Sequence, residues 1–155
     1  MPIPDREPFE TILVQPKSRD STPRTILPLI TFPHGGPHTA TSTAFSPTTT
    51  ALALEGCESK KIAIDITWIT SLSPLDTVSL PNYTGSLGYG DEFVQRLVGN
   101  CGKLDVEDCH ASIRHLIERG IAEEAPGKQF LVGGSHGGFL VAHRMSFPYY
   151  RSFVV

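Results

Sequence analysis

The segment Gly133-Gly134-Ser135-His136-Gly137 places a serine between two glycines, each two residues away from it. This spacing is the pattern of a nucleophile elbow, a tight turn between a strand and a helix that presents a serine hydroxyl above a sheet. Small residues are needed on both sides because the two backbones crowd the turn. The pattern predicts Ser135 as the nucleophile of an acyl transfer, with Gly133 and Gly137 as the elbow glycines. The backbone N–H of His136 would point at the developing oxyanion.

A second glycine-rich segment, His34-Gly35-Gly36-Pro37, follows an apolar run that is typical of a strand. Adjacent glycines let backbone N–H groups approach a ligand without interference from a Cβ. We expect the N–H of Gly35 or Gly36 to donate the second hydrogen bond to the oxyanion. For both segments, a plain glycine-rich turn is the alternative interpretation.

Apolar runs and helical patterns alternate along the chain, and these elements must position the two glycine-rich segments. Ser46 and Asp105 are predicted helix N-caps, and Gly56 and Gly120 are predicted helix stops. Strands that alternate with helices predict an α/β domain with a mostly parallel sheet and flanking helices. The predicted strands are 11–14, 26–32, 62–68, 77–83 and 129–132, and the predicted helices are 47–55, 105–120 and 139–146.

Composition excludes several classes of protein. The 155 residues include 13 Lys+Arg and 16 Asp+Glu, for a net charge of −3, and no run of like charges reaches about five residues. This balance argues against a nucleic-acid partner. No apolar run approaches the roughly 18 residues of a membrane helix, and the first residues do not resemble a secretory signal. We predict a disordered lead-in over residues 1–8 and a single domain over 9–155.

The three cysteines, Cys57, Cys101 and Cys109, are odd in number and irregular in spacing. They predict neither a disulfide framework nor a zinc site, so no metal is expected. We interpret them as free, largely buried thiols of a protein in the reducing cytoplasm.

Three motifs occur in an order that resembles the prolyl oligopeptidase family of serine peptidases, whose catalytic domain is an α/β-hydrolase. They are Leu27–His38, Asn82–Gly90 and Gly133–Phe139. The histidine of the elbow and the form His-Gly-Gly-Pro-His are similar to those of acylaminoacyl-peptidases. Thr84 stands where many members of the family carry an arginine.

The resemblance implies a hydrolase that releases an N-acylated amino acid from the blocked end of a short peptide. It assigns the nucleophile to Ser135 and the oxyanion donors to the N–H groups of His136 and of Gly35 or Gly36. No cofactor is implied, because the chemistry needs only side chains and water. An esterase or lipase on the same elbow, and a truncated fragment that only binds acylated peptides, are the alternatives.

The chain departs from the family after the elbow. In this fold the acidic residue and the histidine of the triad follow the serine. The twenty residues after Ser135 include no Asp or Glu, and their histidines are His136 and His143. The family's β-propeller and the last strands of its sheet have no counterpart here. We therefore expect an incomplete α/β-hydrolase domain that is nearly inactive alone and self-associates through exposed sheet edges.

About twenty residues, 57–76, look inserted between the predicted helix and the strand that begins at Thr77. A retained intron is one explanation, because Cys57-Glu58-Ser59 can be encoded by a splice-donor sequence. A genuine insertion is the other explanation, with Trp68 anchoring an additional strand.

Overall fold

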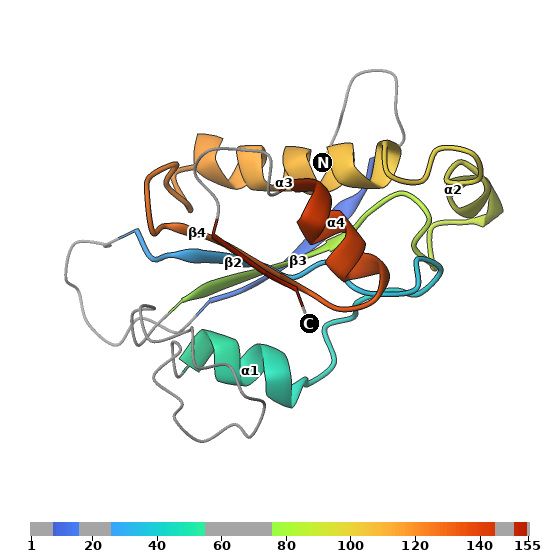
Figure 1. Cartoon of the computed structure of the whole chain (residues 1–155). Helices are drawn as coiled ribbons and strands as arrows, with labels where there is room; N and C mark the ends of the chain where they lie inside the picture. The colour runs from blue at the N-terminus through green and yellow to red at the C-terminus, as the bar shows by residue number, and fades with distance from the viewer. Residues whose placement is uncertain (1–7, 16–25, 55–75, 145–150, 155) are drawn as a thin grey trace.

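The computed structural model describes residues 8–15, 26–54, 76–144 and 151–154. Within them, five strands form one sheet in the order β1-β3-β2-β4-β5 (Figure 1). The strand β1 is antiparallel to β3, and every other neighbouring pair is parallel. The α/β class with a mostly parallel sheet is therefore confirmed. The strands are β1 (Glu10–Val14), β2 (Leu29–Thr31), β3 (Thr77–Asn82), β4 (Gln129–Gly133) and β5 (Arg151–Val154).

Four of these strands coincide with predicted apolar runs, and β5 was not predicted. The strand β2 is only three residues long, although its apolar run extends from Ile26 to Phe32. Pro81 is tolerated in β3 because it lies opposite Thr11 of β1, beyond the last residue that β3 pairs with β2. The predicted strand 62–68, the lead-in up to residue 7 and the insertion up to residue 75 lie outside the described residues.

Helices cover both faces of the sheet (Figure 1). On one face, Leu29 and Leu131 pack with Ile113 of α3 and Val141 of α4. On the other face, Ile30 and Phe130 pack with Ala53 of α1. They lie on this face because successive side chains of a strand point to opposite sides of the sheet. No helix in the described part of the chain is long and apolar enough to span a membrane. The helices are α1 (Pro47–Leu54), α2 (Asp91–Gln95), α3 (Leu104–Glu118) and α4 (His136–Arg144).

Two helix ends agree with the sequence and one does not. The hydroxyl of Ser46 accepts the N–H of Thr49 at 3.3 Å, as expected of an N-cap. Gly120, with φ +65°, follows the end of α3. The prediction that Asp105 caps α3 is wrong: Lys103 is the N-cap residue, and Asp105 lies inside the helix. Its carboxylate is directed to a tertiary partner instead, as described below.

The structure differs from the prediction in two other respects. The short helix α2 was missed because its five residues are too few to show a periodic pattern, although its Phe93 is buried. Cys109 is a buried free thiol as predicted, whereas the free thiol of Cys101 is exposed. Cys101 lies in the loop before α3, so no helical face carries it into the core.

Asp76, the residue before β3, is an uncompensated acidic group in the interior. It is fully buried, and neither oxygen of its carboxylate has a hydrogen-bond partner among the described residues. Burial raises the pKa of Asp76 to about 7. The folded chain therefore retains a proton that the unfolded chain loses near pH 4, so stability falls as pH rises between these values.

We expect the free energy of unfolding to be lower at pH 8 than at pH 5 by about 2–3 kcal/mol from this group. Replacing Asp76 by asparagine removes the dependence and stabilises the chain at pH 8. Urea unfolding of both forms at the two pH values measures the effect. An equal loss of stability with pH in both forms would assign it to other groups.

Candidate active site

The turn between β4 and α4 has the geometry of an elbow. The strand ends at Gly133 and the helix begins at His136. Ser135, between them, has φ +55°, a conformation that is strained for a residue with a side chain, and it is exposed. A Cβ on Gly133 would lie 2.5 Å from the carbonyl group of Gly137, and a Cβ on Gly137 would overlap the carbonyl oxygen of Pro33. Both glycines are therefore sterically required.

The loop after β2 lies directly against the elbow. A Cβ on Gly35 would be 3.4 Å from Cβ and 3.8 Å from Oγ of Ser135. The two segments meet because β2 and β4 are adjacent parallel strands, whose carboxyl ends lie at the same edge of the sheet. Residues that are about a hundred positions apart in the sequence are thus brought together, as the sequence predicts.

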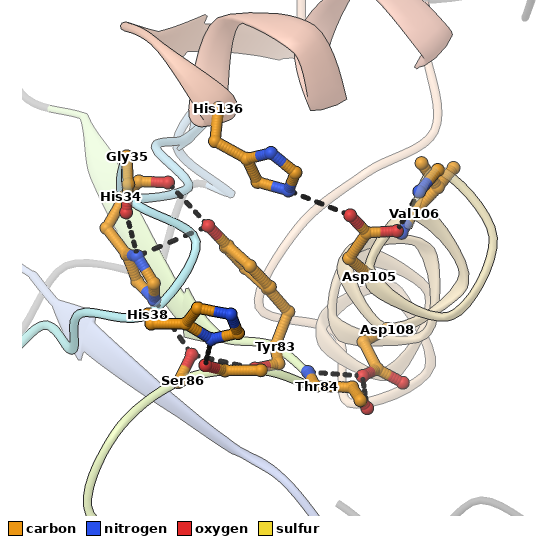
Figure 2. Close-up of polar contacts among 12 residues, drawn as sticks. His34, Gly35, His38, Tyr83, Thr84, Ser86, Asp105, Val106, Asp108 and His136 are labelled. Carbon is orange, nitrogen blue, oxygen red and sulfur yellow. Dashed lines mark hydrogen bonds and ion pairs between the residues drawn. The ribbon is translucent and has the colours of Figure 1, made fainter. Parts of the chain in front are cut away.

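A third glycine-rich segment, Tyr83–Gly90, supports that loop (Figure 2). The Tyr83 hydroxyl donates to the carbonyl of His34 at 2.7 Å. The Ser86 hydroxyl lies 2.8 Å from His34 Nε2 and 2.7 Å from the carbonyl oxygen of Tyr83. His38 Nδ1 donates to the carbonyl of Gly85 at 2.9 Å. These hydrogen bonds restrict the movement of the His34–His38 loop beside Ser135.

The rings of His34 and Tyr83 are uncharged at neutral pH. Burial lowers the pKa of His34, and the neighbouring His136 lowers it further, while the Gly35 backbone opposes the shift. Burial also raises the pKa of Tyr83 above its usual value. The two rings stack with centroids 4.4 Å apart. The stacked pair of His34 and Tyr83 therefore keeps its charge state across the neutral range.

Asp105 and His136 form a pair that the sequence did not reveal. His136 Nε2 lies 2.8 Å from Oδ2 of Asp105, which is completely buried (Figure 2). Oδ1 of the same carboxylate accepts the N–H groups of Gly102 and Val106. The pair ties the residue after Ser135 to the first turn of α3. No local signal marks it, because an aspartate at the start of a helical pattern also fits an N-cap.

The same pair leaves Ser135 without a base. The ring of His136 is engaged with Asp105, and among the described residues Ser135 Oγ has no hydrogen-bond partner. His143, the other downstream histidine, is exposed and packs edge-on against Phe139 with ring centroids 4.4 Å apart. A serine hydroxyl without a neighbouring base is a weak nucleophile at neutral pH.

Thr84, at the position of the family's arginine, has a structural role. Its N–H and its hydroxyl both donate to Oδ2 of Asp108, at 2.7 Å and 2.6 Å. Both residues are buried. Two short hydrogen bonds from Thr84 therefore help to compensate the buried carboxylate of Asp108.

Comparison with known sequences identifies relatives over most of the chain. Residues 75–149 match the prolyl oligopeptidase family. The acylamino-acid-releasing enzyme of Arabidopsis thaliana is 37% identical over 138 residues, which are 89% of this chain and 15% of that protein. The enzyme of the same name from Sus scrofa is 35% identical over 137 residues, 87% of this chain and 15% of that protein. The chain therefore spans about 15% of the length of these curated relatives.

Solved structures give the same result for the fold. A puromycin hydrolase superimposes with a TM-score of 0.73 at 29% identity, over 95% of this chain and 20% of that one. An acylaminoacyl peptidase of Pyrococcus horikoshii superimposes with a TM-score of 0.63 over 93% of this chain and 22% of that one, and at 20% identity it supports the fold alone. The sequence matches and the shared fold confirm that this chain is a member of the prolyl oligopeptidase family, related to its acylaminoacyl-peptidases.

Proposed function

We propose that this chain is the nucleophile-bearing part of a serine peptidase that releases an N-acylated amino acid from the blocked end of a short peptide. The observation that carries the proposal is the strained turn at Ser135 with the Gly35 backbone packed beside its Oγ. The names of the relatives, acylamino-acid-releasing enzymes, support this class of substrate. Their greater length supports a longer protein around this chain.

In the proposed reaction, Ser135 Oγ attacks the carbonyl carbon of the acylated residue, its proton passes to a base, and the C–N bond to the next residue breaks. The N–H groups of His136 and of Gly35 or Gly36 hydrogen-bond the oxyanion, and the amino-terminal end of α4 adds a favourable dipole. The amine leaves with a proton, and water then hydrolyses the acyl-enzyme. Since no described residue offers Ser135 a base, we propose that the base and its acidic partner belong to the rest of the longer protein.

The test is hydrolysis of an N-acetyl-amino-acid anilide and of a short-chain nitrophenyl ester by the longer protein that contains this chain. We expect anilide hydrolysis, and Ser135→Ala should reduce kcat by about 10⁴-fold or more. Ser42→Ala, which removes an exposed hydroxyl elsewhere, is the matched control. Ester hydrolysis without anilide hydrolysis would favour an esterase, and unchanged activity of the Ser135 variant would refute the assignment of the nucleophile.

Two further features of the proposal concern the surroundings of the protein. The described cysteines, Cys101 and Cys109, are both free thiols, which supports a reducing compartment such as the cytoplasm.

The strands β1 and β5 are the two outer strands of the described sheet. We propose that they account for self-association of the isolated chain.

A further inference from the structure

Three groups that can bind metal ions converge behind the elbow. The thiol of Cys101, the carboxylate of Asp105 and the imidazole of His136 have ligand atoms that all lie within 4.8 Å of one another. They come from the loop before α3, the first turn of α3 and the first residue of α4. Because the three residues are not arranged in a zinc-binding sequence spacing, only the packing of α3 against α4 brings them together.

The carboxylate of Asp105 is held in a fixed orientation by the backbone. Its Oδ1 accepts the N–H groups of Gly102 at 2.8 Å and Val106 at 3.0 Å. Its Oδ2 lies 2.8 Å from His136 Nε2, and the Cys101 thiol lies within 4.8 Å of the ligand atoms of both residues. A buried carboxylate fixed on one oxygen and presented on the other is a preorganised ligand.

The three atoms suit zinc in kind and in spacing. Thiolate sulfur, imidazole nitrogen and carboxylate oxygen are its usual ligands, at about 2.3 Å for sulfur and about 2.0 Å for nitrogen or oxygen. Around one tetrahedral ion, such atoms lie roughly 3.2–3.7 Å apart, which is within the span observed here. Three protein ligands leave a fourth position for water. Cys101 is exposed, whereas the side chains of Asp105 and His136 are 0% and 11% exposed, so an ion would enter from the thiol side.

We propose that Cys101, Asp105 and His136 form a binding site for a thiophilic divalent cation of the zinc type. As the ion binds, the thiol of Cys101 releases its proton to solvent. The proton on His136 Nε2 moves to Nδ1, so that the nitrogen lone pair faces the ion. The metal replaces the hydrogen bond between Asp105 and His136, and it joins the start of α3 to the residue that follows Ser135.

Cobalt(II) tests the proposal without any need for turnover, so the result does not depend on the proposed peptidase activity. The reduced, metal-free 155-residue chain is titrated with Co²⁺, and absorption reports sulfur-to-cobalt charge transfer and the tetrahedral ligand field. We expect one saturable site with a thiolate band that Zn²⁺ abolishes by competition. Absence of a saturable thiolate band would overturn the proposal.

Variants identify the ligands. Cys101→Ser changes an exposed side chain, and it should remove the charge-transfer band and weaken binding by roughly 100-fold or more while circular dichroism is unchanged. His136→Ala should weaken binding similarly. Cys109→Ala removes the buried thiol of α3 and serves as the matched control, with the band retained. A band that persists in Cys101→Ser, or disappears in Cys109→Ala, would place the metal on another thiol and refute the site.

Discussion

Replacing Gly137 by alanine is expected to lower the free energy of unfolding by about 3 kcal/mol. The new Cβ would overlap the carbonyl oxygen of Pro33 and come within 3.1 Å of the carbonyl oxygen of His34. Backbone atoms on both sides of this contact are held by β2, β4 and the hydrogen bonds of His34, so neither side can move at little cost. Urea unfolding measures the loss.

Gly127→Ala is the matched control for this prediction. Gly127 has a positive φ, +76°, which Gly137 does not have, and nothing lies within 4 Å of a Cβ built on it. Its substitution therefore reports the left-handed conformation alone, which costs about 1–2 kcal/mol. If the two substitutions destabilise the chain equally, then the loop after β2 does not pack against α4 as closely as described.

The second large effect concerns the reactivity of Ser135. We expect a fluorophosphonate to label the 155-residue chain about 10⁴-fold more slowly than the longer protein that we propose contains it. The elbow and the adjacent Gly35 backbone are present in the chain, but no described residue can accept the proton of the Ser135 hydroxyl. Electrostatic stabilisation of the oxyanion then acts without general-base catalysis.

Labelling rates are measured by mass spectrometry at several reagent concentrations. Ser135→Ala gives the background rate of reaction at other hydroxyls, and Ser42→Ala should react like the unmodified chain. Labelling at the rate of the longer protein would mean that a base within these 155 residues activates Ser135. Substitution of His136 and His143 one at a time would then identify it.

Residues that interact locally were largely predictable. The close approach at Gly133 is local, because a Cβ there would meet the carbonyl group of Gly137. The requirement for glycine at position 137 comes instead from the loop after β2, which lies far away in the sequence. The cap at Ser46 and the stop at Gly120 also depend on atoms a few residues away. The strands were found because the faces of a buried parallel sheet require short apolar runs. Features of this kind depend on residues that are close together in the chain, so the sequence pattern is sufficient to predict them.

The sequence by itself therefore determined the elbow, the second glycine loop and the class of fold. Only the tertiary structure decided what Asp105, Tyr83 and Asp76 do. Asp105 meets His136 across 31 positions, and Tyr83 meets His34 across 49. Asp76 has an ordinary polar sequence context and a fully buried carboxylate. The reason is physical: hydrogen bonds and desolvation act over a few ångströms in space, and chain folding alone sets which distant groups come that close.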